Sequence, residues 1–398
     1  MVTSLRKNLI IKNISLEEIQ LDGACKATYL GNKLKVYGGI EGEVVDVEVI
    51  AKENDLICNV IKVINPDKDR IDNKCSHFLE CSGCQFQHIK YEKQLDIKKQ
   101  FVKNVLEEFD INIDKKINDV IPSNKKYNYR NHARFSVSKS KKYIGNSGFI
   151  NRWTRKLVNI SNCEIMNEKI NFKREQTIGN LNGMSQYSLR VSVKNDSYLI
   201  QPEIEKLKIL SGQTHYYESF KNRDVKISSP SFFQVNLEQA EKLGDIISDI
   251  ASLTGKETII DAFSGVGTFS LLLSEKVKKI YAIESSYSSI EDAKINLKDL
   301  DNVNLIQSEV ENLNEDYFDE NIDIIILDPS RKGVHSSALD WVLKLLPNQI
   351  IYVSCNIETL KKDLIGLEKK YEIGKIIPLD MFPQTKHVEC VVNLQRVD

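Results

Sequence analysis

The chain has 398 residues, of which 41% are hydrophobic and 28% charged, and its formal net charge is −1. This composition excludes a disordered or fibrous protein and supplies about two to three hydrophobic cores. No stretch reaches the roughly 18 apolar residues of a membrane helix, so we expect a cytoplasmic protein that does not bind membranes. In the cytoplasm, the eight cysteines are better interpreted as metal ligands or catalytic groups than as disulfides.

Residues 1–66 predict short strands within 9–16, 23–39, 42–52 and 56–66, separated by glycine-rich turns. Short strands of this number bury enough apolar surface only by closing up, which favours an OB-like β-barrel. Residues 67–226 are more polar and basic, with scattered strands. We expect them to form a central α+β domain whose helix near 91–110 packs on the C-terminal domain.

Strands and helices alternate regularly from 227 to 398, which predicts an α/β domain with a parallel sheet covered on both faces. The expected strands lie in 257–263, 279–284, 302–307, 321–329 and 350–354. Two closing strands, in 372–382 and 387–395, are expected to form an antiparallel hairpin.

The segment IIDAFSGVGTFSLLL, residues 259–273, predicts a strand, a tight turn through Gly265 and Gly267, and a helix. Such a turn brings backbone N–H groups close to a ligand, and Glu284, at the end of the next strand, can hold ribose hydroxyls. These features together predict a nucleoside-cofactor site. Ser270 replaces the third glycine or alanine of the dinucleotide motif, which favours S-adenosylmethionine over NAD.

Two further strands are expected to end in reactive groups at the same edge of the sheet. Asp328 precedes Pro329, which cannot extend a strand, so its carboxyl should face the crevice. An Asp-Pro-x-aromatic motif would suit methylation of an exocyclic amine, but Arg331 takes the aromatic position. Cys355 lies where a strand meets a helix, and we expect the helix N-terminus to lower its pKa and favour the nucleophilic thiolate.

A methyl donor beside a cysteine nucleophile indicates alkylation of an unreactive ring carbon such as C5 of uracil. Addition of a thiolate at C6 activates C5, and a general base must later remove the C5 proton. Glu389 is the candidate base. It lies in an apolar strand, where burying a carboxylate costs free energy unless the group has a role or a partner. The alternative is an ion pair with Lys386 or His387. Cys390 is expected to pack on the opposite face of that strand.

Four other cysteines, Cys75, Cys81, Cys84 and the distant Cys163, supply four thiolates. Four soft ligands suit zinc or an iron–sulfur cluster, and the spacing alone leaves both open.

The stretch 124–156 holds ten lysines and arginines and no acid, interleaved with aromatic residues. Cations can contact phosphates, and aromatic rings can stack on unpaired bases, so we expect single-stranded or flipped-out RNA as the partner. The candidate phosphate contacts are Arg130, Arg134, Lys139 and Arg152. The alternative is a solvated basic face whose aromatic residues belong to a core.

Several motifs together resemble the RNA uracil-C5 methyltransferases that act on 23S ribosomal RNA or tRNA, and the resemblance covers nearly the whole chain. They are, in chain order, FFQVN at 232–236, DAFSGVGTFS, DPSRKG, SCNIETLKKDL and HVECV. The resemblance implies a class I, Rossmann-like, S-adenosylmethionine-dependent methyltransferase domain at 227–398, a TRAM domain at 1–66 and an iron–sulfur domain at 67–226. Ser264 and Ser330 depart from residues common in the family, at positions that carry no chemistry.

The same resemblance implies roles for individual residues. Gln234 contacts the donor or the base, Phe263 lies beside the donor, Glu284 holds the ribose and Asp328 lines the shared pocket. Cys355 is the nucleophile and Glu389 the general base.

The resemblance also favours [4Fe–4S] over zinc. Gly83, Gln87 and His88 match the cluster motif, whereas Ser82 replaces a glycine.

We therefore expect a monomeric RNA uridine C5-methyltransferase that uses S-adenosylmethionine and carries a [4Fe–4S] cluster. Two alternatives remain open from sequence. An exocyclic-amine methyltransferase of RNA or DNA would not need Cys355, and a noncatalytic RNA-binding iron–sulfur protein would not bind the donor.

Overall fold

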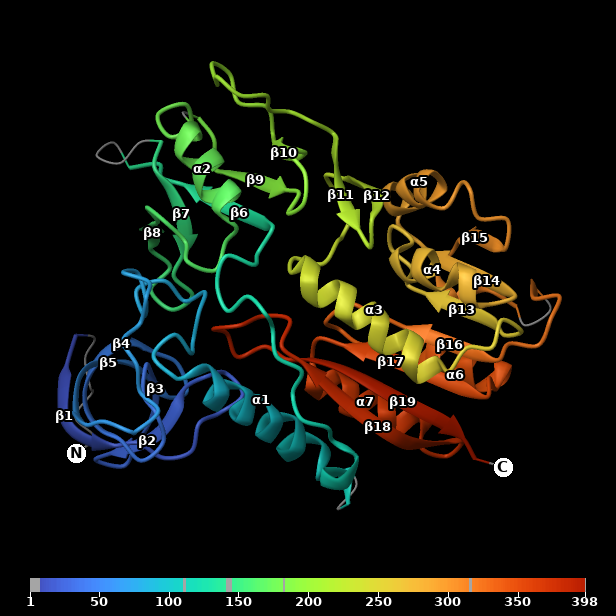
Figure 1. Ribbon diagram of the computed structural model, residues 1–398. Helices are drawn as coiled ribbons and strands as arrows, with labels where there is room; N and C mark the ends of the chain where they lie inside the picture. The colour runs from blue at the N-terminus through green and yellow to red at the C-terminus, as the bar shows by residue number, and fades with distance from the viewer. Residues whose placement is uncertain (1–7, 110–111, 141–144, 182, 315–316, 398) are drawn as a thin grey trace.

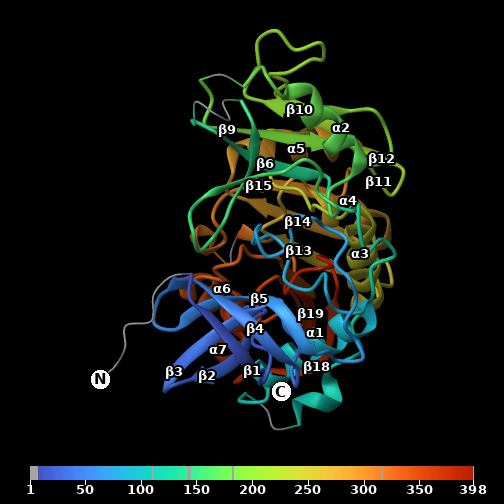
Figure 2. The same cartoon turned by 90° about the vertical axis from the view of Figure 1, so that its left-hand side faces the viewer.

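The computed structural model describes residues 8–109, 112–140, 145–181, 183–314 and 317–397, and the strands within them form four sheets. The N-terminal sheet lies at one end, the central sheet above it, and the large C-terminal sheet beside both (Figure 1). A quarter turn places the N-terminal strands below the central sheet, with the helices of the C-terminal domain behind them (Figure 2). No helix in these described ranges is both long and apolar enough to cross a membrane.

The N-terminal sheet has the strand order β1-β4-β5-β3-β2. Val45, Val47 and Val49 of β4 are at most 1% exposed, whereas the residues between them are half-buried, which is the period-two alternation of a strand with one face on a core. All neighbouring strands pair antiparallel except β3 and β5. The strands are β1 (Ile10–Ser15), β2 (Cys25–Tyr29), β3 (Asn32–Tyr37), β4 (Val44–Lys52) and β5 (Leu56–Asn65). All of them lie within the segments that the sequence predicts.

The central region holds a five-stranded sheet of order β10-β9-β6-β7-β8 and a separate β11–β12 hairpin. The sheet packs on α2 (Glu168–Thr177) through a core that includes Phe135, Ile170 and Tyr187. The strands are β6 (His132–Val137), β7 (Ser147–Ile150), β8 (Leu157–Asn159), β9 (Gln186–Val191), β10 (Tyr198–Gln201), β11 (His215–Phe220) and β12 (Arg223–Ser228).

The C-terminal sheet has seven strands in the order β15-β14-β13-β16-β17-β19-β18. The first five are parallel, and β19 lies antiparallel between β17 and β18. The second strand of the closing hairpin, and not the first, therefore pairs with β17. The strands are β13 (Thr258–Ala262), β14 (Lys279–Glu284), β15 (Val303–Gln307), β16 (Ile324–Leu327), β17 (Gln349–Ser354), β18 (Tyr371–Leu379) and β19 (Glu389–Arg396).

Two cores cover the two faces of this sheet, as the alternation in β13 shows: Ile259 belongs to one core and Ile260 to the other. Both faces are apolar because parallel strands are covered on both sides. The helices and 3-10 turns of the C-terminal region are α3 (Leu237–Ala251), α4 (Thr268–Leu273), η3 (Ser274–Lys276), α5 (Tyr287–Asn296), η4 (Val310–Asn312), α6 (Ser336–Leu345) and α7 (Ile357–Leu367).

Helix α1 (Tyr91–Leu106) joins the central region to the C-terminal domain, and a 3-10 turn, η1 (Ile113–Lys116), follows it. Phe101 and Val102 of α1 lie in the same core as Leu360 of α7. The Nζ atom of Lys98 donates to the Asp380 carboxylate at 2.6 Å, and both side chains are fully buried. The Tyr91 hydroxyl donates to the same carboxylate at 2.8 Å. A buried, hydrogen-bonded ion pair therefore fixes α1 to the end of β18.

Candidate active site and four-cysteine cavity

The expected cofactor turn lies between the end of β13 and the start of α4. Phe263, Gly265 and Gly267 all have positive φ values, of 65°, 57° and 87°. A Cβ atom at Gly267 would lie 2.8 Å from Cδ1 of Leu297, so glycine is needed there for packing as well as for conformation. Phe263 is a non-glycine residue in a strained conformation, which is typical of ligand sites.

Glu284 ends β14, the parallel neighbour of β13, and reaches back to this turn. Its carboxylate accepts the N–H of Gly265 at 2.9 Å and the N–H of Ser286 at 2.7 Å. The structure thus brings Glu284 and the glycine turn together, as the sequence predicts. The carboxylate is half-buried, so it remains accessible to ribose hydroxyls.

Asp261 anchors the same turn from below. It is fully buried and accepts the Ser270 hydroxyl at 2.6 Å and the Ser270 N–H at 3.0 Å. Its second oxygen, Oδ1, has no hydrogen-bond partner. Burial raises the pKa of Asp261 to about 6, with a smaller contribution from Glu284. Ser270, whose identity favours S-adenosylmethionine over NAD, therefore also holds the loop in place.

Cys355 and Glu389 are brought together by strand register. β17 pairs with β19 so that Ser354 lies opposite Cys390, and Cys355 and Glu389 are the next residues beyond this last pair. Glu389 is close enough to act on the pKa of Cys355. Asp328 follows β16, the other neighbour of β17, and therefore reaches the same edge of the sheet. Cys390 is fully buried in the core.

Burial dominates the electrostatics of these groups. It raises the pKa of the Cys355 thiol to about 11, Glu389 adds to this rise, and the Arg331 guanidinium opposes it. Burial also raises the pKa of Asp328 to about 7, and it raises that of Glu389 well above its usual range. The expectation of a thiol pKa lowered by the start of α7 is therefore wrong, because burial and the nearby carboxyl groups raise this pKa.

Glu389 is 2% exposed, and within the described part of the chain it forms no ion pair with Lys386 or His387. The alternative interpretation of Glu389 as half of a salt bridge is not supported by these contacts. Burial and neighbouring cations, Arg331 first, lower the pKa of His387 to about 3, so this histidine is neutral.

A cavity of about 200 Å³ opens at Cys355. Arg331, Lys386 and His387 line it, and no sequence pattern predicts a role for any of them in the chemistry. Arg331 had a detectable signal, since it follows Asp328 directly in the same motif. Leu21 of the N-terminal region also lines the cavity, and no local pattern could have indicated that contact.

Gln234 lies between β12 and α3 and is half-buried. Its carbonyl accepts the side-chain N–H of Asn131 at 3.3 Å, and the backbone of Asn131 donates to Val235 at 2.9 Å. These contacts tie the segment that carries Gln234 to the central sheet. The neighbouring Phe232 is 66% exposed.

The four cysteines predicted as ligands, Cys75, Cys81, Cys84 and Cys163, line one cavity of about 330 Å³. Burial raises the pKa of each thiol, to about 11 for Cys163. No group of three or more His, Cys, Asp or Glu side chains among the described residues converges on a single ion.

Hydrogen bonds position the two segments that carry these cysteines. The buried Gln87 accepts the Cys75 N–H at 3.1 Å, and His88 contacts the Gly39 carbonyl of the N-terminal region at 3.0 Å. The Cys163 N–H donates to Asn171 of α2 at 3.0 Å. Gln87 and His88 therefore hold the loop.

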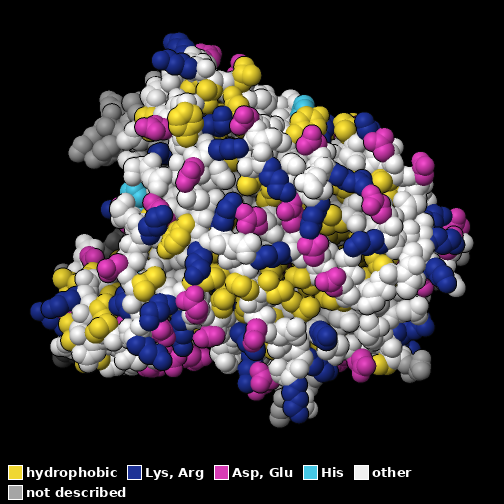
Figure 3. Space-filling view, in the orientation of Figure 1, with side chains coloured by type: hydrophobic (Ala, Val, Ile, Leu, Met, Phe, Trp, Pro, Cys, Tyr) yellow, Lys and Arg dark blue, Asp and Glu magenta, His cyan; other side chains and the backbone are white. Residues whose placement is uncertain are grey.

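The basic stretch divides into core and surface. Tyr129 and Phe135 are at most 2% exposed, so these two aromatic residues belong to a core, as the alternative interpretation predicts. Arg130 and Arg134 lie on the wall of the four-cysteine cavity. Lys139 and Arg152 are exposed. Basic and acidic side chains are interspersed over the face in Figure 3, in keeping with the net charge near zero.

Comparison with known proteins agrees with this geometry. A family profile described as tRNA (Uracil-5-)-methyltransferase matches residues 204–397. An RNA methyltransferase of Bacillus cereus is 30% identical, over 100% of this chain and 99% of its own length. One of Clostridium acetobutylicum is 32% identical over 91% and 92%. A solved structure, the Pyrococcus abyssi tRNA (uracil-54, C5)-methyltransferase with S-adenosyl-L-homocysteine, has a TM-score of 0.75 at 23% identity and covers 96% of this chain and 99% of that one.

The parallel sheet, the glycine turn held by Glu284 and these relatives together define an RNA methyltransferase that uses S-adenosylmethionine. The chain belongs to the family of RNA uracil-C5 methyltransferases.

Proposed function

We propose that the protein methylates C5 of a uridine in 23S ribosomal RNA or tRNA, with Cys355 as nucleophile and Glu389 as general base. The observation that supports this most directly is that Cys355, Glu389 and Asp328 lie at one edge of the sheet, where both carboxyl groups act on the pKa of the thiol. An amine methyltransferase would need neither a thiol nor a second buried acid at this position.

In the proposed reaction, the Cys355 thiolate adds to C6, and the electron pair displaced from the C5=C6 bond makes C5 nucleophilic. S-adenosylmethionine supplies the methyl group that C5 takes up. Glu389 then removes the C5 proton, the double bond re-forms, and the thiolate leaves. The raised pKa of Glu389 makes its carboxylate a stronger base than an exposed one.

Arg331 is the cation that favours the thiolate, since it lowers the pKa of Cys355 against the effect of burial. Asn356 places it: the Asn356 side chain donates to the Arg331 carbonyl at 3.1 Å and accepts the Glu358 N–H at the start of α7 at 3.1 Å. One side chain thus caps α7 and holds the Arg331 loop beside the nucleophile. For the donor itself, we assign Gln234, Phe263, Gly265, Gly267, Glu284 and Asp328.

We further propose that Cys75, Cys81, Cys84 and Cys163 hold a [4Fe–4S] cluster. Their placement around one cavity, and the positive side chains of Arg130 and Arg134 on its wall, suit a group that carries four thiolates. Such a group would join the loop that follows the N-terminal region to the segment before α2. We expect its role to be structural.

The test uses transcripts of tRNA and of 23S ribosomal RNA segments that contain 5-fluorouridine, incubated with the whole protein and S-adenosylmethionine. Fluorine at C5 cannot leave as a proton, so we expect a methylated covalent complex, visible on a denaturing gel and by mass. Cys355→Ala should abolish it, and Cys390→Ala, on the opposite face, should retain it. Methyl transfer to RNA that survives in Cys355→Ala would contradict the mechanism and favour the amine methyltransferase.

A further inference from the structure

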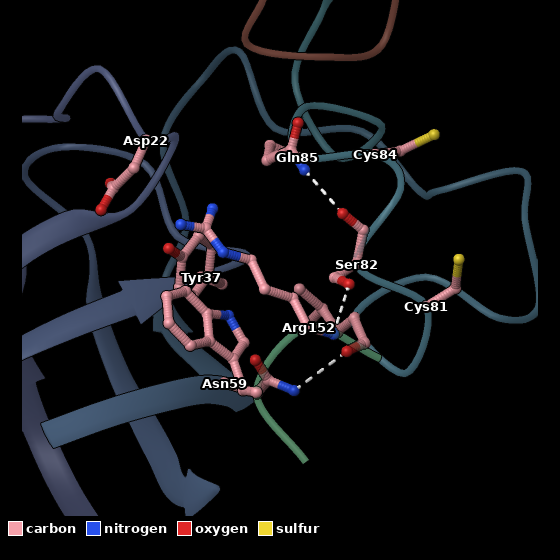
Figure 4. Close-up of a pocket in the computed structure, with 10 residues that line it drawn as sticks. Asp22, Tyr37, Asn59, Cys81, Ser82, Cys84, Gln85 and Arg152 are labelled. Carbon is pink, nitrogen blue, oxygen red and sulfur yellow. Dashed lines mark hydrogen bonds between the residues drawn. The ribbon is translucent and has the colours of Figure 1, made fainter. Parts of the chain in front are cut away.

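A third pocket lies between the N-terminal sheet and the cysteine loop (Figure 4). Its walls include Asp22, Tyr37, Ser82, Gln85, Arg152 and Trp153. The turn that carries Arg152 is held by the cysteine loop, because Ser82 Oγ accepts the Arg152 N–H at 2.9 Å and Asn151 donates to the Glu80 carbonyl at 2.7 Å.

Two groups in this pocket are poorly satisfied. Tyr37 is only 8% exposed, and its hydroxyl interacts with the Asp22 carboxylate without forming a well-aligned hydrogen bond, which is costly for a buried donor. The exposed Arg152 side chain lies over the Trp153 ring, 4.6 Å from its centroid. It has no ion-pair partner among the described residues. A poorly satisfied donor and an unpaired cation beside an aromatic face indicate a ligand.

The pocket adjoins the active site. Gln85, on its wall, accepts the N–H of Lys386, which lines the Cys355 cavity, at 3.2 Å. Leu21 lines the Cys355 cavity and Asp22 lines this pocket, so one loop separates them. Burial lowers the pKa of Lys386, and the neighbouring Arg152 and Arg331 lower it further. Neighbouring cations of this kind favour an anionic partner such as a nucleic-acid backbone.

We propose that this pocket is a subsite for the RNA nucleotide next to the target uridine, with its base stacked on Trp153 and its phosphates held by Arg152 and Lys386. The proposal rests on the proposed function, since it takes the uridine to be bound at Cys355. The Tyr37 hydroxyl gains a partner on the nucleotide, and the Asp22 carboxylate, which already accepts Lys35 at 2.7 Å, can accept an amino group of the base.

Arg152 must move for the base to enter. The enclosed space is about 30 Å³, which is room for one water molecule. The guanidinium occupies the stacking position over the indole, where a planar base fits equally well. A base stacked on an aromatic ring is held more strongly than an exposed arginine, and the displaced guanidinium gains a phosphate. Arg152 therefore acts as an exchangeable plug.

The test measures binding of fluorescein-labelled nonauridylate to the whole protein by anisotropy, without S-adenosylmethionine. Stacking tolerates any base, so this probe suffices. Trp153→Ala and Arg152→Ala should each weaken binding about tenfold, and Arg152→Ala should also reduce the salt slope by about one. Phe172→Ala, an aromatic residue that is 61% exposed elsewhere, and Lys156→Ala, an exposed cation on the same turn, are the matched controls and should change binding less than about twofold.

Tyr37→Phe separates binding from folding. Because it removes only a poorly satisfied hydroxyl, its thermal midpoint should be unchanged or higher, whereas RNA binding should weaken about threefold. If Tyr37→Phe and Trp153→Ala both bind like the controls, or if Tyr37→Phe lowers the midpoint without weakening binding, the subsite is wrong. Failure of the fluorouridine complex with these binding losses intact would instead refute the proposed chemistry and leave the subsite standing.

Discussion

The carboxyl edge of the C-terminal sheet and the four-cysteine cavity both gather buried ionisable groups, but they hold them differently. At the sheet edge, Asp328, Cys355 and Glu389 follow or begin strands whose hydrogen-bond ladders set their positions. Around the cavity, the cysteines lie outside regular strands and helices, and a few side-chain hydrogen bonds position them.

The two sites therefore differ in how much of their order a bound ligand would have to supply. The sheet edge is formed by the fold alone. Burial raises the pKa values of its acids, to about 6 for Asp261 and about 7 for Asp328. The cysteine loop has few backbone hydrogen bonds of its own, so a bound cluster would supply much of its order. We therefore expect changes at the sheet edge to affect chemistry and changes at the cysteines to affect local stability.

The largest effect should follow from Glu389→Gln, which keeps the shape of the side chain and removes the base. Release of free methylated RNA should fall by about 10²–10⁴-fold, and the methylated covalent RNA complex should accumulate because elimination is blocked. Multiple-turnover release of methylated RNA and a denaturing gel measure the two effects. Glu372→Gln, an exposed acid on β18, is the control and should behave as the unaltered protein. Full activity in Glu389→Gln would show that another group removes the proton.

Lys98→Met tests whether the sheet edge depends on α1. It leaves the Asp380 carboxylate buried without its cation, so the free energy of unfolding should fall by about 3–5 kcal/mol in denaturant titrations. Lys99→Met, whose partner Asp119 is fully solvent-exposed, should leave the free energy of unfolding nearly unchanged. Equal losses in the two variants would mean that the buried pair has no special weight.

The pH dependence of stability should identify the acids of the sheet edge. The pKa of Asp261 is about 6 in the folded protein and 3.8 ordinarily, so the folded state binds more protons than the unfolded state between these values. This contribution to stability is present at low pH and is lost as pH rises through about 6. Asp261→Asn should remove a fall of about 3 kcal/mol across that window. An unchanged pH profile in the variant would contradict the raised pKa.

Cys163→Ser addresses the other side of the comparison and should have the smallest and most local effect. Hydrogen exchange of residues 68–90 should accelerate at least about tenfold, or about 1.4 kcal/mol, while S-adenosylmethionine binding stays within about twofold. Cys58→Ser, in the N-terminal core, is the control and should leave that loop unchanged. A loop that exchanges at the same rate in Cys163→Ser would mean that the cysteines do not order it.

By itself, the sequence determined the strands, the parallel arrangement and the glycine turn, because period-two and helical spacing are local properties. It also indicated Glu284, Asp328 and Cys355, since each ends a strand of a recognisable α/β pattern. Only the tertiary structure decided that β19 inserts beside β17 and so brings Glu389 to the same edge of the sheet as Cys355. The thiol pKa, too, depends on burial by distant segments, which outweighs the local helix dipole. Leu21 at the Cys355 cavity and Tyr37 beside Trp153 are contacts between segments far apart in the chain, which short-range patterns cannot encode.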